Sequence, residues 1–335
     1  MTVLSEPTGG SVASSLRSTW AGWRLPAYLV TKAIASGMFM IMAAVWLLGV
    51  STFDRRTALV GNGIALVFLA ITTVLLVADL DRPERFLRIL TRPQWKSWLT
   101  RGAFILVGFS VVCTAWFAVE LGAQLGWLPE GVAEAVRVPL MMLGFPLALM
   151  SAIYTAFLFR QCEGGDLWQS RLLPWHMGVQ AVMAGGAVWT LLLFGYYTRW
   201  VGFVSVSFLP ELPFEVASFL VAGVVDLLIR WAEVSHHLPT ANGTQAAWIV
   251  RFGGERGKWR ASMLMGGQPI LSLVALFGLW NYWQDKSVGF RTKDAVPFQL
   301  TLIFHSLKAV PVVALVGLFL YESAIIKAGQ DVPNA

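Results

Sequence analysis

The sequence predicts an all-α integral membrane protein of about eight transmembrane helices, paired as two four-helix bundles. The prediction rests on composition: 56% of the 335 residues are hydrophobic and 13% are charged. A soluble globular domain carries about 25% charged residues, so this chain has too little polar surface to face water on all sides. The mean hydropathy of +0.64 points the same way.

A transmembrane helix needs about 20 predominantly apolar residues. Residues 1–24 form a polar N-terminal segment, and residues 25–335 are expected to form the transmembrane domain. The first apolar stretch is too long for the core of a signal peptide, so it should remain as a helix. The windows that meet the required length are 25–50, 57–80, 98–121, 138–160, 172–197, 213–234, 262–283 and 296–326.

The positions of Lys and Arg predict the orientation of these helices. An even number of spans places both termini on one side, and sixteen Lys and Arg residues fall on that side against seven on the other. The positive-inside rule then puts both termini in the cytoplasm. A basic loop that docks an acidic partner would bias this count in the same direction.

Ionisable side chains within predicted spans are costly in lipid and are therefore candidates for function. In this sequence they are Lys32, Asp79, Glu120, His176, Asp226, Arg230, Glu233, His305 and Lys308.

Four polar groups are predicted to share one half of the bilayer. With a rise of 1.5 Å per residue, Lys32 and Tyr154 lie about 9 Å from the same membrane face and His176 about 6 Å from it. Asp79 ends the second span on that face. Such an arrangement would form a polar pocket. Each residue also has a structural interpretation: Lys32 could snorkel to the interface, Tyr154 could belong to the aromatic belt, and His176 could be a buried histidine with its hydrogen bonds satisfied.

Two groups of the remaining candidates can be interpreted from their spacing. Asp226 and Arg230 are four residues apart, with Glu233 three further on, which is the spacing of a self-neutralising helical ion pair. His305 and Lys308 are one helical turn apart, and they would either pass protons or line a packed polar seam.

Redox metals are not expected in this chain. His176 and His305, counted from opposite membrane faces, differ in depth by roughly 10 Å, which disfavours them as axial ligands of one haem. An iron–sulfur cluster normally needs about four cysteines, whereas this chain contains Cys113 and Cys162.

The strongest local signal follows the second predicted span, in residues 79–86 and onward to Ser97 and Trp98. Charges of both signs alternate densely here, and Pro83 favours the first turn of an interfacial helix. Such a segment is a docking surface for a partner protein or for anionic lipid. Its arginines are Arg82, Arg85, Arg88 and Arg92.

This stretch resembles the NrfD/PsrC family of quinone-reactive membrane subunits, of polysulfide reductase type. In that family the second helix typically ends in Asp/His-Leu-Gly-Arg-Pro-x-Arg-Phe, and a Ser, a Trp and a Gly open the third helix. Asp81 stands here where the family usually has Gly. Tyr154-Thr155 matches a further motif, with Ala156 in place of its Gly, and the run from Lys32 to Gly37 is also similar. The residues that match the first motif are Asp79, Leu80, Arg82, Pro83, Arg85, Phe86, Ser97, Trp98 and Gly102.

The resemblance implies a pocket for menaquinone or ubiquinone among the first four helices. Its catalytic residues would be Asp79, Tyr154 and Lys32, with Arg82 also in the pocket, and the matched depth of His176 adds this imidazole to the quinone-binding residues. Quinone reduction needs two electrons and two protons, so the protein would position and protonate the ring. The resemblance further implies a ferredoxin-like iron–sulfur partner, a catalytic subunit of molybdopterin type, no haem, and a place in the bacterial cytoplasmic membrane.

Two other classes remain open from the sequence. A haem b cytochrome subunit would show a Soret band, and a transporter would show discontinuous helices in paired positions. As an extension of the quinone hypothesis, the sequence also predicts a proton route through Glu120, Asp226, His305 and Lys308.

Overall fold

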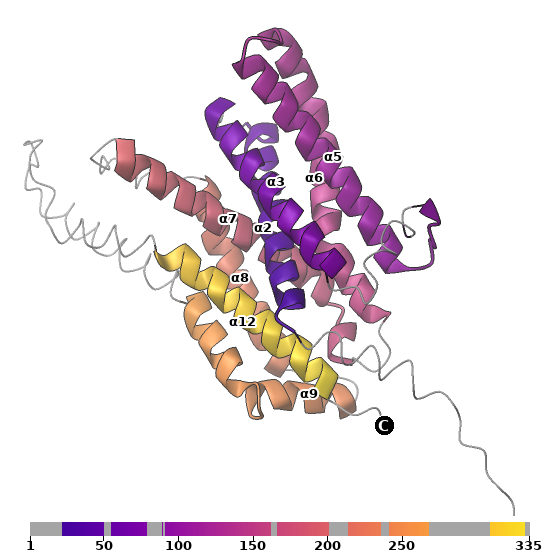
Figure 1. Cartoon of the computed structure of the whole chain (residues 1–335). Helices are drawn as coiled ribbons and strands as arrows, with labels where there is room; N and C mark the ends of the chain where they lie inside the picture. Colours follow the sequence, from indigo (N-terminus) through magenta and orange to yellow (C-terminus); the bar gives the residue numbers. More distant parts are fainter. Residues whose placement is uncertain are drawn as a thin grey trace, which may run out of the picture.

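A computed structural model describes residues 22–49, 55–78, 89, 91–161, 166–200, 214–235, 241–267 and 309–331. The described part is helical, with turns between the helices (Figure 1). Residues 256–267 are also helical. The other elements are α2 (Arg24–Leu47), α3 (Arg55–Ala78), α5 (Trp98–Gln124), α6 (Glu130–Arg160), the short 3₁₀ helix η2 (Asp166–Gln169), α7 (Leu173–Trp200), α8 (Phe214–Ser235), α9 (Ala241–Arg251) and α12 (Ala309–Asp331).

Among the described residues, five helices are long and apolar enough to cross a membrane, namely α2, α3, α5, α6 and most of α12. These correspond to the first four predicted windows and to the last one. The α7 and α8 helices occupy two further windows. The prediction of an α-helical membrane protein is therefore confirmed. The number of eight spans and their grouping into two bundles stay predictions, because much of 262–283 and the start of 296–326 lie outside the described residues.

The first helix, α2, is the centre of the molecule. It packs against α3, α6, α7 and α12, and in Figure 1 it runs between α5 and α6 on one side and α7, α8 and α12 on the other. Of its most apolar 18-residue window, 78% is buried, compared with 28% for α3. Side chains of α2 can therefore contact residues of α3 and α6 as well as residues of α7 and α12.

The α3 helix shows how an outer helix meets lipid. Apart from Leu69, the residues that face inward are small or polar, and a stripe of large apolar side chains on the opposite face is exposed. Without water as solvent, helices associate through close packing rather than through burial of large apolar groups, so the larger side chains remain on the lipid side. The inward residues are Ala58, Gly61, Asn62, Ala65, Leu69 and Thr72, and the exposed ones include Val60, Val67, Ile71 and Val74.

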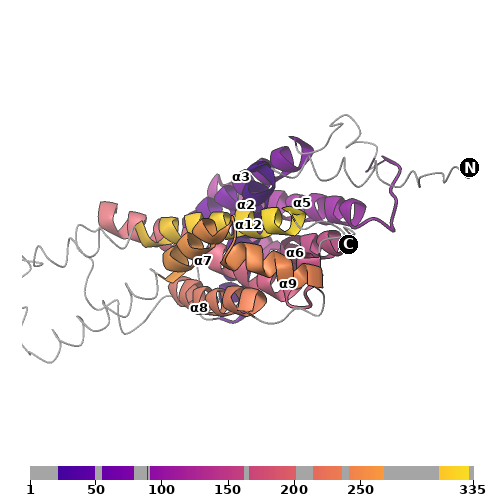
Figure 2. The ribbon, with the colours of Figure 1, turned by 90° about the horizontal axis from the view of Figure 1, so that it is seen from below.

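The start of α2, the end of α3, the start of α5 and the end of α6 lie at the same end of the molecule. Arg24 at the start of α2 donates a hydrogen bond to the carbonyl of Ala78 at the end of α3. Gln161, just beyond α6, accepts a hydrogen bond of 2.9 Å from the backbone N–H of Trp98 at the start of α5. We call this end, with Arg24, Trp98 and Gln161, the first face. The α9 helix packs against α12, and the view from below looks onto both of them (Figure 2).

Candidate functional site

Two phenols, an ammonium and a hydroxyl meet in the half of the membrane domain near the first face. They are Tyr28 and Lys32 on α2 and Tyr154 and Thr155 near the end of α6, which we call the tyrosine–lysine cluster. The hydroxyls of Tyr28 and Tyr154 share a hydrogen bond, and the Lys32 ammonium donates one to the Thr155 hydroxyl. The Nζ atom of Lys32 lies 4.6 Å from the ring centroid of Tyr154. All four side chains are buried.

The local sequence explains this meeting. Tyr28 and Lys32 are four residues apart on α2 and so point from the same helix face. Lys32 does not snorkel out to the interface, because its ammonium is held inside by Thr155 and by the faces of the two phenol rings. Lys32 and Tyr154, for which the sequence predicts a common depth, are thus in direct contact in the structure.

Gly102 of the predicted motif makes room for Tyr154. A Cβ atom on Gly102 would lie 2.1 Å from Cε2 and 2.4 Å from Cδ2 of the Tyr154 ring. Tyr154 is 2% exposed, so its ring has little space into which it can move. The glycine therefore lets α5 approach α6 closely enough to cover the phenol.

We expect Gly102→Ala to destabilise the protein by about 1–3 kcal/mol, the usual cost of overpacking. The matched control is Gly108→Ala on the same helix, where the added Cβ would lie 3.7 Å from Leu147 Cδ2, an ordinary contact. Thermal unfolding of both variants in detergent tests the difference. Equal melting temperatures for the two variants would show that Tyr154 does not depend on this glycine.

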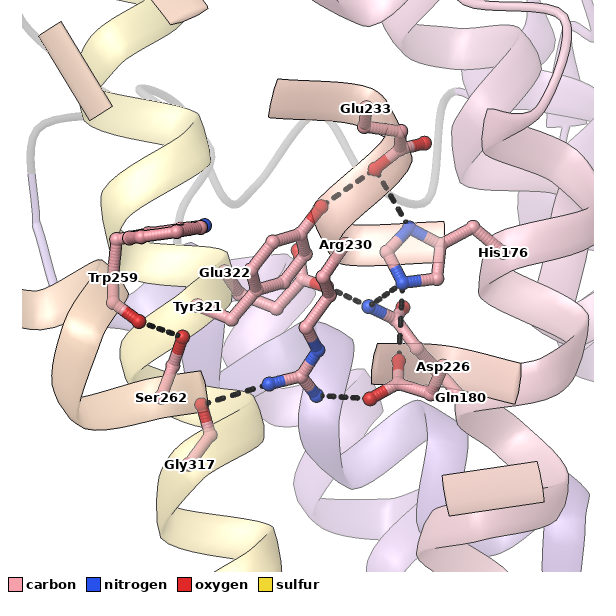
Figure 3. Close-up of polar contacts among 10 residues, drawn as sticks. All are labelled: His176, Gln180, Asp226, Arg230, Glu233, Trp259, Ser262, Gly317, Tyr321 and Glu322. Atoms are coloured by element: carbon pink, nitrogen blue, oxygen red, sulfur yellow. Dashed lines mark hydrogen bonds and ion pairs between the residues drawn. The ribbon is translucent and has the colours of Figure 1, made fainter. Parts of the chain in front are cut away.

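A second buried polar group joins α7, α8 and α12 (Figure 3). His176 on α7 lies between two carboxylates of α8: its Nδ1 is 2.9 Å from Glu233 Oε2, and its Nε2 is 3.0 Å from Asp226 Oδ1. Because an ionised carboxylate only accepts hydrogen bonds, this arrangement requires both ring nitrogens to donate, as they do in imidazolium. We call the whole group the histidine network; its members are His176, Gln180, Asp226, Arg230, Glu233, Tyr321 and Glu322.

The other members complete the pairing of these charges. Arg230 Nη2 lies 2.6 Å from Asp226 Oδ2, which confirms the predicted ion pair within α8. Its guanidinium carbon is 4.6 Å from the ring centroid of Tyr321, and the Tyr321 hydroxyl donates a 2.6 Å hydrogen bond to Glu233. The α8 charges therefore neutralise one another and also hold His176.

Gln180 extends the network towards the last helix. Its Nε2 donates a 2.7 Å hydrogen bond to Glu322 Oε1 on α12, and the same nitrogen lies 3.3 Å from His176 Nε2. The histidine network lies beside the tyrosine–lysine cluster, because α2, which carries Lys32, packs against both α7 and α12.

Glu120 lies elsewhere, at the opposite end of α5. Arg137 Nη2 donates a 3.0 Å hydrogen bond to Glu120 Oε2, and Trp116 Nε1 donates one of 3.1 Å to Oε1. Arg55 also approaches, at 3.4 Å. Eighteen residues of α5 separate Glu120 from Gly102, a distance of about 27 Å along the helix.

The remaining predicted site residues fall into two groups. Arg92 is described and exposed, as a docking residue should be. The others lie outside the described residues, so their placement stays a prediction: Asp79, Arg82, Arg85, Arg88, His305 and Lys308.

Sequence reasoning missed several members of these two groups. Tyr28 and Gln180 carry no charge, and nothing in the sequence marks them except their spacing of four residues from Lys32 and His176. Glu322 could have been identified from the sequence, because it is a carboxylate inside the last predicted span and the rule for intramembrane charges applies to it. Its contact with α7 could not be foreseen, since no sequence pattern places α12 against that helix.

Comparison with known protein families identifies the family of this chain. Residues 11–255 match the family described as polysulphide reductase NrfD. A search of curated proteins found no match. The match spans more than half of the chain and includes Lys32, Tyr154 and His176, while α12 with Glu322 lies beyond it. Members of this family are membrane subunits of redox complexes. The chain therefore belongs to the polysulphide reductase NrfD family.

Proposed function

We propose that the chain is the quinone-reactive membrane subunit of a multi-subunit oxidoreductase. The observation that carries the proposal is the tyrosine–lysine cluster. Proton donors of two chemical kinds, phenol and ammonium, converge in the half of the membrane domain near the first face. Carbonyl oxygens of a quinone need such donors, and the ring itself suits an apolar surrounding.

The donor set fits a quinone in its chemistry. A bound quinone would supply the two-electron redox chemistry. Tyr154 and Tyr28 can each turn a hydroxyl from their shared hydrogen bond towards a carbonyl oxygen. Lys32 can donate from its ammonium while Thr155 accepts one of its other protons. The chain's own residues would therefore orient the ring and deliver protons, as general acids do.

Electrons would come from or go to a partner. We propose a ferredoxin-like iron–sulfur subunit in this role, connected to a catalytic subunit of molybdopterin type. The basic segment that contains Arg92 is the proposed docking surface, and Arg82, Arg85 and Arg88 belong to the same surface. Asp79, at the predicted end of the second helix, would exchange protons at the mouth of the site.

The same proposal includes the setting of the protein. We place it in the bacterial cytoplasmic membrane with both termini in the cytoplasm, on the strength of the distribution of Lys and Arg. The quinone would be menaquinone or ubiquinone. A proton route through Glu120, Asp226, His305 and Lys308 is retained as an extension, with Asp226 already joined to His176.

Two substitutions test the site. Tyr154→Phe removes one hydroxyl and keeps the ring, and Lys32→Met keeps the length of the side chain without its charge. In the assembled complex, we expect each to lower quinone-linked turnover by about 100-fold or more, since general acid–base catalysis typically contributes about 10²–10⁴-fold. Turnover with a soluble dye that takes electrons from the catalytic subunits should stay at the wild-type rate.

Ser110→Ala is the matched control. It also removes one hydroxyl, but that hydroxyl bonds the carbonyl of Leu106 within α5 and belongs to neither polar group. Its quinone-linked turnover should be unchanged. Full activity and full sensitivity to quinone-analogue inhibitors in both Tyr154→Phe and Lys32→Met would rule out this site.

A further inference from the structure

The α9 helix is too short to cross a membrane. Its 11 residues extend about 16 Å, roughly half of a hydrocarbon core. The helix packs against α12 and against η2, which follows the end of α6 at the first face. Trp168 of η2 in turn donates a 3.4 Å hydrogen bond to the carbonyl of Ile325 in α12. The α9 helix therefore lies at the level where the membrane helices end, which is the level of the lipid headgroups.

The two sides of α9 differ in exposure. Ala246, Ala247 and Val250 are buried against the rest of the protein. Trp248 and Phe252 are 58% and 53% exposed, and their ring centroids are 6.5 Å apart. Exposed aromatic rings on a short helix at this level are typical of the boundary between headgroups and acyl chains.

Basic side chains lie directly beside these rings. The guanidinium carbon of Arg251 is 5.2 Å from the ring centroid of Phe252. Arg256 and Arg260 follow, both exposed and one helical turn apart. Residues 241–260 contain one acidic residue, Glu255, and four basic ones, namely Arg251, Arg256, Lys258 and Arg260. The segment beside the aromatic rings therefore carries an excess of positive charge.

Glu255 does not offset the charge of the three arginines. It is 3% exposed and pairs with Lys258 and with Lys327 of α12, each at 2.9 Å. Burial alone would raise the pKa of Glu255, but the hydrogen bonds from these two lysines outweigh that effect and hold the pKa below its usual range. The carboxylate is thus ionised, and the two ammonium groups already balance its charge.

The helix of residues 256–267 continues the same surface along the direction of the membrane helices. Arg256, Arg260 and Leu264 are spaced by four residues and so share one helix face, on which Leu264 is 71% exposed. Another face of this helix packs against α12, where a Cβ atom on Gly317 would lie 3.2 Å from the carbonyl oxygen of Ser262. Two cations followed by a large apolar side chain on one exposed face match the order of groups in a phospholipid, a charged headgroup followed by an acyl chain.

We propose that this surface binds an anionic phospholipid. We call it the arginine–aromatic surface; its members are Trp248, Arg251, Phe252, Arg256, Arg260 and Leu264. The guanidinium groups would bind the phosphate oxygens, for which their planar donor geometry is suited. The aromatic rings and Leu264 would contact the acyl chains. The inference is independent of the proposed function, because the surface shares no residue with the tyrosine–lysine cluster or the histidine network.

Lipid binding by the purified protein, alone and in the assembled complex, tests the proposal. Native mass spectrometry with added phosphatidylglycerol or phosphatidylcholine of the same acyl chains measures both affinities. We expect the wild type to bind phosphatidylglycerol more tightly. Arg256→Gln and Arg260→Gln should each weaken that binding about fivefold, and together about 30-fold, as expected for basic residues next to anionic headgroups. Binding of phosphatidylcholine should change little.

Arg56→Gln is the matched control. Arg56 is an exposed arginine at the start of α3, far from the first face. Its neighbour Arg55 is paired with Glu120 and Glu130, so Arg56 does not belong to a cluster of excess cations. This variant loses the same charge and should keep the wild-type affinity for phosphatidylglycerol.

Tryptophan fluorescence gives a second measurement that leaves the arginines intact. Phosphatidylglycerol with bromine atoms near the start of its acyl chains should quench the wild type more than Trp248→Phe, because Trp248 would lie against those chains. This comparison also decides the question if the double arginine variant does not fold. Equal quenching of the two proteins would overturn the proposal.

Two further results would contradict lipid binding. One is equal affinity of the wild type for the two lipids, or wild-type affinity in the double arginine variant. The other is a double variant that keeps phosphatidylglycerol but loses a partner subunit from the complex. In that case the arginine–aromatic surface docks a protein instead of a lipid.

Discussion

Replacing Gly185 by Ala is expected to cost about 3 kcal/mol or more of folding free energy, the upper end of what overpacking usually costs. A Cβ atom on Gly185 would lie 2.2 Å from the carbonyl carbon of Gly37 and 2.3 Å from the backbone nitrogen of Met38. These are backbone atoms within α2, and they cannot rotate away as a side chain can. Helices in lipid rely on such close approach of small residues, so the α2–α7 contact should open.

The measurement is thermal unfolding in detergent, together with the yield of folded protein. Gly223→Ala is the control, because a Cβ there meets no atom within 4 Å. It also lies within a helix, where Ala is favoured over Gly by up to about 1 kcal/mol. We therefore expect Gly223→Ala to be neutral or slightly stabilising. If Gly185→Ala and Gly223→Ala have the same melting temperature, the close contact between α2 and α7 does not contribute to stability as expected.

The crossing matters for the site as well as for the fold. The α2 helix carries Tyr28 and Lys32, and α7 carries His176 and Gln180. An opened crossing would move the tyrosine–lysine cluster on α2 away from the histidine network on α7. Protein that does fold with Gly185→Ala should therefore lose quinone-linked turnover along with its stability.

Among the described residues, the sequence predicted the long helices well, because runs of apolar residues are long and charges mark their ends. The start of α6 shows what an apolar window does not predict. The hydropathy window begins at residue 138, but the helix begins at Glu130. The first turns contain Arg137, whose charge excluded it from an apolar window. In the structure that charge is paired with Glu120, so the helix continues through it.

The sequence predicted the depth of the site residues in the membrane, but not which of them contact one another. Counting residues along each helix gave the common level of Lys32, Tyr154 and His176, but depth says nothing about which faces meet. The structure joins Lys32 to the α6 pair Tyr154 and Thr155. It joins His176 instead to Glu233 on α8 and, through a ring contact, to Tyr321 on α12. Rotation about the helix axis depends on packing, above all on the glycines that allow close approach. No single residue type in the sequence reveals that rotation.

The second large effect concerns Arg137. Arg137→Met should cost about 3 kcal/mol or more, because removal of one partner leaves the other charge buried. Glu120 is 2% exposed, and its remaining cation, Arg55, lies 3.4 Å away with 21% of its side chain exposed. Arg137 also stacks over Trp46 of α2, with its guanidinium carbon 4.4 Å from the ring centroid. Thermal unfolding in detergent measures the loss.

A double variant shows whether Glu120 does more than pair with Arg137. Arg137→Met combined with Glu120→Gln removes both charges, and replacing a buried ion pair by neutral groups of similar volume is often close to neutral in stability. The double variant should therefore recover most of the loss, whereas an equally unstable one would contradict the pairing. If Glu120 belongs to the predicted proton route, the recovered protein should still show reduced proton uptake in sealed vesicles. Wild-type proton uptake would instead limit the role of Glu120 to holding α5 against α6, since a carboxylate that is needed as a proton carrier cannot be replaced by an amide.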